Sequence, residues 1–184
     1  MLKDTISYIF REFIKIRTDQ LDENDKNASL VQKSVLFWLI FNSTNTSFGK
    51  KHKFLKIRSI KSFQKNVPIA HYVDLKNDIF KMLNGKSNIL WPGKTIYFAK
   101  SSATTSESKY IPVTPNALYR CHFKGGKDMI AFYIKNNPET KLFTGKVLSL
   151  CGTFYPYEKN LKAKTGDISR SEERRVGKEC RSRW

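Results

Sequence analysis

Two stretches near the amino terminus carry hydrophobic patterns typical of helices. From Leu2 to Arg17 the apolar residues recur every three or four positions, which predicts an amphipathic helix with one buried face. From Ser29 to Ile40 they surround nearly the whole helix, which predicts a second helix that is buried more completely. The first pattern consists of Leu2, Ile6, Ile9, Phe10, Phe13 and Ile16, and the second of Leu30, Val31, Val35, Leu36, Trp38 and Leu39.

Polar and helix-ending residues divide the segment that follows. Asn42–Gly49 is polar and ends the second predicted helix, and residues 50–68 are typical of loop and short helix. Asp74 is a favourable helix cap, so we expect a further helix that it opens, that runs to Asn84 and that stops at Gly85.

The hydrophobic period changes after Gly85. Thr95–Ala99 is a short β-branched and aromatic run that follows the turn Trp91-Pro92-Gly93, and it predicts a strand. Thr114-Pro115 combines an N-cap with a proline at the first helical position, which predicts a long helix reaching about Lys135. Lys146–Leu150 predicts a second strand. Helices followed by strand, polar loop, helix and strand indicate an α/β fold.

Composition narrows the class of protein. The chain has 184 residues, of which 40% are hydrophobic, enough for a globular domain with a core. The longest apolar run, Val35–Phe41, is far shorter than the roughly 20 residues that span a bilayer, so we expect no membrane span and no secretion signal. Three cysteines without a pattern argue against a disulfide framework. We therefore expect a cytoplasmic, reduced protein.

The last residues differ in composition from the rest. Residues 1–169 contain 24 Lys and 4 Arg, whereas residues 170–184 contain 1 Lys and 5 Arg. The end has almost no apolar periodicity, which predicts a disordered tail, and it resembles a translated cloning adaptor. We therefore expect residues 1–168 to form the folded part and residues 169–184 a tail, which is adaptor-derived or a native basic end.

A polar loop is the main candidate for chemistry. Residues 100–109 hold six hydroxyl side chains and two lysines directly after the first predicted strand. Hydroxyls, main-chain amides and a lysine at a strand end can together bind an oxyanion or a phosphate. A Ser/Thr-rich surface turn has the same composition, and the residues alone leave both readings open.

Two other motifs are weaker. Gly93-Lys94-Thr95 looks like the end of a Walker A loop, but Asn88 replaces the first glycine and a predicted strand follows. Cys121-His122 lies in a predicted helix, where adjacent side chains cannot both face one metal ion, so we predict no metal site.

Several segments, in order, resemble the auxin-responsive (Gretchen Hagen three) family of acyl-acid amido synthetases. They are residues 63–69 (FQKNVPI), 72–75 (YVDL), 88–93 (NILWPG), the loop 101–114, 121–128 (CHFKGGKD) and 142–150 (LFTGKVLSL). The resemblance covers about Lys50 to Gly152 and implies an adenylate-forming, firefly-luciferase-like enzyme. It implies that the parent enzyme uses ATP and Mg2+ to convert a carboxylic acid into an acyl adenylate, and then transfers the acyl group to an amino acid.

The resemblance also implies the residues that hold ATP. The nucleotide phosphate loop would be formed by Ser101, Ser102, Thr104, Thr105 and Lys109. Ala103 stands where the family has glycine, so a positive φ there would be strained and its methyl group would lie near the phosphates. Because family members are several times longer, we expect an amino-terminal part of the large domain that is inactive alone, with no complete catalytic set.

The net charge of +18 keeps a second function class open. A basic module could bind nucleic acid or another polyanion. Its candidate residues would be Lys50, Lys51, Lys53, Lys56, Arg58, Lys61 and Lys65. Elsewhere the excess charge is spread as single lysines, which argues against a dedicated nucleic-acid groove.

Overall fold

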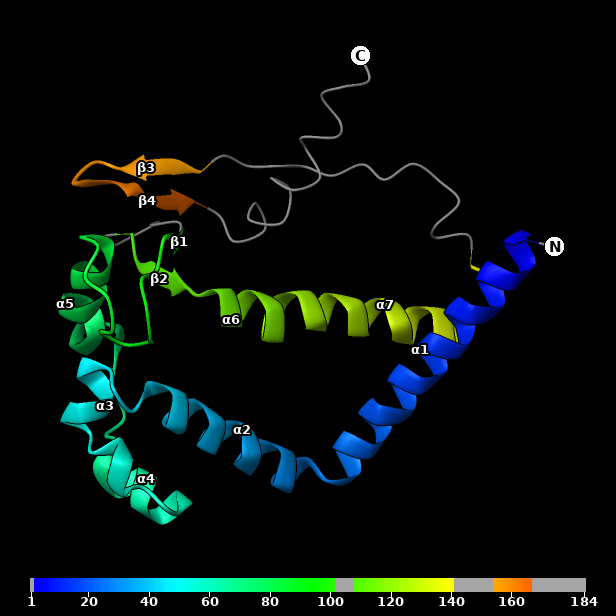
Figure 1. Ribbon diagram of the computed structural model, residues 1–184, viewed down its shortest axis with the longest axis horizontal. Helices are drawn as coiled ribbons and strands as arrows, with labels where there is room; N and C mark the ends of the chain where they lie inside the picture. The colour runs from blue at the N-terminus through cyan, green and yellow to red at the C-terminus, as the bar shows by residue number, and fades with distance from the viewer. Residues whose placement is uncertain (1, 102–107, 141–153, 167–184) are drawn as a thin grey trace. The chain divides into compact units, whose positions relative to one another are not determined.

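The computed structural model describes residues 2–101, 108–140 and 154–166, which form two compact units (Figure 1). Of the described residues, the first unit comprises 2–36 and 115–140, and the second 37–101, 108–114 and 154–166. The division falls inside helix α2 (Ala28–Ser43), so one continuous helix contributes to both. In the described ranges no helix is both long and apolar enough to cross a membrane.

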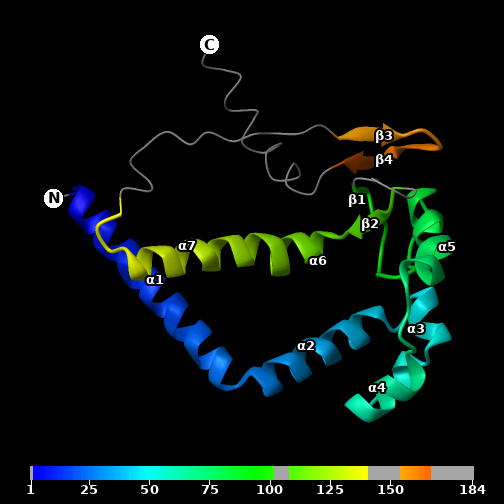
Figure 2. The ribbon, with the colours of Figure 1, turned by 180° about the vertical axis from the view of Figure 1, so that it is seen from behind.

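The first unit is helical. It contains α1 (Leu2–Lys26), α6 (Pro115–Ala117), the π-helical turn η2 (Leu118–Phe123) and α7 (Lys124–Asn136). Figure 2 shows α1 crossing α7, and the two helices share a small core of Ile14, Ala131 and Ile134, with Ile130 packed beside it. This apolar contact holds together two helices that are far apart in the sequence.

Two ion pairs reinforce the α1–α7 contact. The Arg17 guanidinium donates to both carboxylate oxygens of Asp128, with Nε–Oδ1 at 2.6 Å and Nη2–Oδ2 at 2.8 Å. This hydrogen bonding, with the charge of Asp128, raises the pKa of Arg17 although burial opposes the change. Lys135 Nζ contacts Asp22 Oδ2 at 2.8 Å in a more exposed position.

The predicted amino-terminal and central helices are confirmed with changes in extent. Helix α1 continues beyond Arg17 to Lys26, and the helix predicted from Thr114 to Lys135 is present as α6, η2 and α7. The expectation that the second helix is deeply buried is wrong. Leu30 is 66% and Val35 50% exposed; an apolar pattern shows which sides of a helix are apolar, but not whether other segments cover them.

The second unit combines short helices with a mixed sheet, so the α/β expectation is confirmed. Its helices are α3 (Ser47–Lys51), η1 (Phe54–Lys56), α4 (Ile60–Asn66) and α5 (Tyr72–Leu83), and its strands are β1 (Tyr97–Lys100), β2 (Tyr110–Val113), β3 (Tyr155–Tyr157) and β4 (Asn160–Gly166). The strand order is β2-β1-β4-β3. β1 is antiparallel to β2 and parallel to β4, whereas β3 and β4 are antiparallel.

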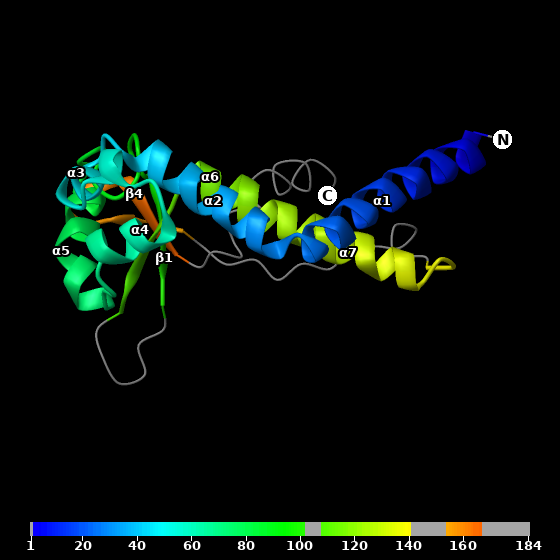
Figure 3. The same cartoon turned by 90° about the horizontal axis from the view of Figure 1, so that it is seen from below.

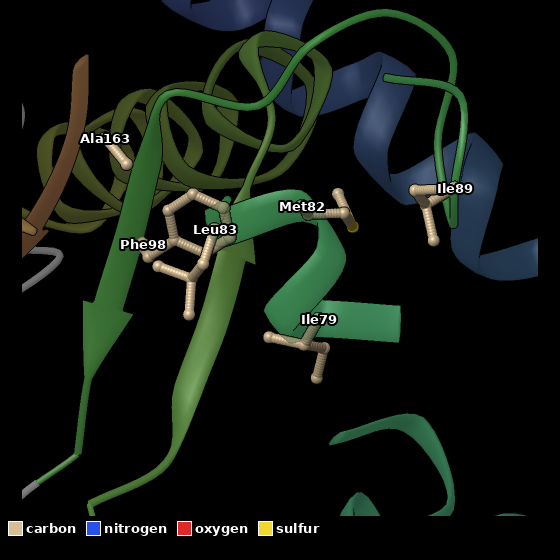
Figure 4. Close-up of a cluster of buried hydrophobic side chains, with 6 residues drawn as sticks. All are labelled: Ile79, Met82, Leu83, Ile89, Phe98 and Ala163. Carbon is tan, nitrogen blue, oxygen red and sulfur yellow. The ribbon is translucent and has the colours of Figure 1, made fainter. Parts of the chain in front are cut away.

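The core of this unit lies between α5 and the sheet. Figure 4 shows Phe98 of β1 beside Leu83 of α5, and both side chains have no exposed surface. Met82 and Ala163 are each 1% exposed and complete the contact from α5 and β4. Asn160 Nδ2 also donates to the Leu83 carbonyl at 2.8 Å, which joins the end of α5 to the start of β4.

Several boundaries differ from the sequence predictions. β1 begins two residues later than predicted. Helix α5 is capped by His71, and Asp74 occupies the third helical position, where its Oδ2 accepts the His71 N–H at 2.8 Å. The C-terminal end agrees, since Asn84 is the C-cap and Gly85 has a φ of +89°. The strand predicted at 146–150 lies outside the described residues, and β2, β3 and β4 were not predicted.

Candidate functional site

The polar loop lies between β1 and β2 and is closed by one residue pair. The Ser101 N–H donates to the Lys109 carbonyl at 3.0 Å, and the Lys109 N–H donates to Ser101 Oγ at 3.1 Å. Lys100 and Tyr110 are the next pair in the ladder, and Figure 3 shows β1, the strand that precedes the loop, from below. The structure therefore brings together two predicted phosphate residues that are eight positions apart.

The loop leaves the carboxyl end of β1, which is also the end at which the parallel strand β4 finishes. Ala99 is in register with Gly166, the last residue of β4. In sheets with parallel strands, ligands bind outside the carboxyl ends, where loops and main-chain amides converge. The location of the loop is therefore suited to an anionic ligand.

The exit of the loop rests on helix α5. The hydroxyl of Tyr72, the first residue of α5, accepts the Tyr110 N–H at 2.9 Å. The Lys109 ammonium lies over the Tyr72 ring, 5.6 Å from its centroid. The Tyr110 ring makes edge contacts with Phe80 and Tyr157, with centroids 6.0 and 5.9 Å apart. Aromatic packing thus joins the end of the loop to the core.

The described loop residues fit a phosphate group. Ser101 Oγ accepts one hydrogen bond from Lys109 and keeps its own hydrogen for donation. Lys109 is exposed and supplies a compact positive charge. The other candidates, Ser102, Thr104 and Thr105, lie outside the described residues, as does Ala103.

A second turn precedes β1 in the chain. Asn88, at a φ of +56°, makes two hydrogen bonds with Gly93: its backbone N–H donates to the Gly93 carbonyl, and its side-chain Oδ1 accepts the Gly93 N–H at 2.7 Å. Trp91 of this turn packs against Trp38 with ring centroids 5.6 Å apart. The chain continues from Gly93 into β1 and not into a helix, so the Walker A reading stays rejected.

The remaining candidates gather no ligand set. Cys121 is exposed in η2, and the described ranges contain no cluster of three or more His, Cys, Asp or Glu side chains able to hold a metal ion. The basic residues between 50 and 65 are exposed on α3, η1, α4 and the segments between them. They are distributed over these segments as solvent-facing charges.

Comparison with known proteins identifies the family. Residues 17–170 match the GH3 family N-terminal domain. The chain belongs to the GH3 family. The indole-3-acetic acid-amido synthetase GH3.4 of Arabidopsis thaliana is 32% identical over 107 residues, which is 57% of this chain and 18% of that protein. The Arabidopsis indole-3-acetic acid-amido synthetase GH3.2 is 31% identical over 102 residues, covering 54% of this chain and 19% of the relative.

The fold also matches a solved GH3 structure. The GH3.15 acyl acid amido synthetase superposes with a TM-score of 0.66 at 19% identity, over 84% of this chain and 27% of that one. The predicted fold, a partial α/β domain of this family, is therefore confirmed. The chain spans about a fifth of the length of the curated GH3 relatives that it matches. These comparisons lend no support to the alternative of a polyanion-binding module.

Tyr72 is the functional candidate that sequence reasoning missed. In the sequence, Tyr72 was only the first residue of the family-like segment 72–75, and no role was predicted for it. A single aromatic residue in the first turn of a helix has no periodic signal, and its contacts with Lys109 and Tyr110 join residues far apart in the chain. Only the folded structure brings these groups together.

Proposed function

We propose that this chain supplies the ATP phosphate loop of an acyl acid amido synthetase. The observation that carries the proposal is the closed Ser101–Lys109 pair at the carboxyl end of β1, in a chain that belongs to the GH3 family. A serine hydroxyl and a lysine ammonium at the base of a Ser/Thr-rich loop are the donors that phosphate oxygens require. On the cysteine pattern we also propose a cytoplasmic location.

The proposed reaction has two steps. A carboxylate oxygen of the acid attacks the α-phosphorus of ATP, the bond to the bridging oxygen breaks, and pyrophosphate leaves with the electron pair. The amine of an amino acid then attacks the acyl carbon, loses a proton and displaces AMP, which yields an amide. The role of Ser101, Ser102, Thr104, Thr105 and Lys109 is to bind and orient the phosphates by directed hydrogen bonds and positive charge. Mg2+, when bound, would neutralise further phosphate charge.

The chain by itself is proposed to be inactive, because it spans only about a fifth of its curated relatives. We expect the purified 184-residue chain to release no pyrophosphate from ATP and carboxylic acids above a protein-free control. Sustained release that depends on both ATP and acid would show that this portion carries a complete adenylation site, contrary to the proposal.

The loop is tested by grafting residues 17–170 into Arabidopsis GH3.4 in place of the matching segment. ATP–pyrophosphate exchange is then measured with indole-3-acetic acid. Lys109→Ala should slow exchange about tenfold to a hundredfold, because losing one phosphate-facing charge costs roughly 1.5–3 kcal/mol. Ala103→Gly should strengthen ATP binding, since glycine lacks the methyl group and adopts a positive φ without strain.

Lys159→Ala is the matched control. Lys159 is an exposed lysine between β3 and β4, at the amino end of β4, and so at the sheet end opposite the loop. It changes the net charge equally and should leave exchange unchanged. The proposal fails if Lys109→Ala is as silent as Lys159→Ala while Ala103→Gly weakens ATP use. If the graft does not fold, Mg·ATP titration of the 184-residue chain decides, through the amide chemical shifts of Ser101 and Lys109.

A further inference from the structure

The outer edge of β2 explains why a tyrosine is needed beside the loop. β2 is the outermost strand of the order β2-β1-β4-β3. Because Ser101 and Lys109 are a hydrogen-bonded pair, antiparallel alternation turns the backbone nitrogens of Tyr110 and Pro112 away from β1. Proline has no N–H to satisfy. The Tyr110 N–H does, and it donates to the Tyr72 hydroxyl at 2.9 Å.

The Tyr72 side chain is itself held firmly. It begins α5 directly after the cap residue His71, whose N–H is bound by Asp74. Its ring packs against the core cluster that contains Ile79, Leu83 and Phe98. A side chain fixed at both its backbone and its ring is a rigid support, unlike the solvent-facing lysine above it.

The contact between Tyr72 and Lys109 preserves the charge that a phosphate needs. The Lys109 ammonium lies 5.6 Å from the centroid of the Tyr72 ring. An aromatic face attracts an ammonium group without neutralising it, whereas a carboxylate would compete with an incoming phosphate. The same tyrosine therefore restrains both the backbone that follows Lys109 and the ammonium of Lys109.

From this juxtaposition we infer that Tyr72 is a positioning residue for phosphate binding, which holds the Lys109 ammonium at the exit of the β1–β2 loop. The inference rests on the proposed function of the loop, but the contact itself is measurable without nucleotide. The Tyr72 hydroxyl fixes the β2 backbone, and the Tyr72 ring limits the directions that the lysine side chain can take. Less side-chain freedom is then lost when a phosphate binds.

Three variants of the 184-residue chain separate these roles. Tyr72→Phe removes the hydroxyl and keeps the ring, and Tyr72→Leu removes both. Leu90→Ala is the packing control, because Leu90 packs against the same core cluster. The readouts are the hydrogen-exchange rate of the Tyr110 amide, the ring-current shift of the Lys109 ε-methylene protons, and the affinity for Mg·ATP.

Tyr72→Phe should speed Tyr110 amide exchange at least about tenfold and keep the Lys109 ring-current shift. Tyr72→Leu should abolish that shift and lower the affinity for Mg·ATP about three- to fivefold, the size expected of one exposed cation–π contact. Leu90→Ala should lower stability while leaving the Lys109 shift and the nucleotide affinity unchanged.

Two results would overturn the inference. One is a Tyr72→Leu chain with an unchanged Lys109 shift, and the other is loss of that shift with unchanged Mg·ATP affinity, which would make Tyr72 a packing residue only. If the amide chemical shifts of Ser101 and Lys109 in the wild-type chain do not change when Mg·ATP is added, the proposed function is instead overturned. The Tyr110 amide exchange rate and the Lys109 ring-current shift, both measured without nucleotide, would then still decide whether Tyr72 holds the ammonium.

Discussion

The ion pair between Arg17 and Asp128 should contribute more to stability than the pair between Lys135 and Asp22. Both pairs join α1 to α7, so each controls for the other. The Arg17–Asp128 pair makes two hydrogen bonds, and both side chains are only 19% exposed. The Lys135–Asp22 pair makes one contact, with side chains 41% and 48% exposed.

The expected magnitudes follow from this geometry. Exposed ion pairs contribute about 0.2–1 kcal/mol, and water and salt screen them. A two-pronged arginine–carboxylate pair is stronger, and partial burial reduces the screening, so we expect a coupling free energy of about 1–2 kcal/mol for Arg17–Asp128. For Lys135–Asp22 we expect about 0.2–0.5 kcal/mol, falling towards zero in high salt.

Two double-mutant cycles measure the difference. One combines Arg17→Met with Asp128→Ala, and the other combines Lys135→Met with Asp22→Ala. The opening free energy is taken from amide hydrogen exchange at Ile134, a core residue of the same helical unit. Equal coupling energies in the two cycles, or equal sensitivity to salt, would refute the reasoning from burial and geometry.

Four further substitutions test the packing, the backbone conformation and one hydrogen bond. Phe98→Ala should lower the free energy of unfolding by about 3–5 kcal/mol, because a fully buried ring is lost; a loss below about 1 kcal/mol in urea denaturation would mean that α5 does not pack there. Gly126→Ala should stabilise α7 by about 0.5–1 kcal/mol, since the added Cβ meets nothing within 4 Å. Gly85→Ala should destabilise the chain, because Gly85 has a φ of +89°. Changes in melting temperature of the same sign for the two variants would contradict this contrast. Asn160→Ala should cost about 1–3 kcal/mol by leaving the Leu83 carbonyl unpaired, and unchanged exchange protection around the end of α5 would argue against that bond.

The helices were the part of the fold that the sequence could predict. Their apolar spacing and terminal residues are local signals, as with Thr114-Pro115 at the start of α6 and Gly85 after α5. Most strands gave no such signal. In β4 the buried positions are the small residues Ala163 and Thr165, which alternate with lysines and carry little hydrophobicity. β2 contains Pro112, which a strand tolerates only at an edge, and edge position is a property of the assembled sheet.

The candidate site, too, could be predicted only in part from the sequence. The local density of hydroxyls and lysines marked the loop, and the structure brings its two described ends, Ser101 and Lys109, together as one pair. The roles of Ser102, Thr104 and Thr105 stay predictions. The helix that supports the exit of the loop could not be foreseen, because the Tyr72–Tyr110 hydrogen bond depends on how α5 packs against β2. Sequence thus located the loop but not its support.

The pairing of β1 with β4 has a consequence for how the chain folds. The helices from α6 to α7 lie between these two strands in the sequence and belong to the other unit, yet Tyr97 pairs with Lys164. On a ribosome, β1 and β2 emerge long before the strand that completes their sheet, so Phe98 lacks its Ala163 neighbour during that interval. Contacts of such high sequence separation form slowly. The nascent chain therefore exposes an unpaired β1 edge while the intervening helices are made, which is the interval in which chaperone binding or misassociation competes with folding.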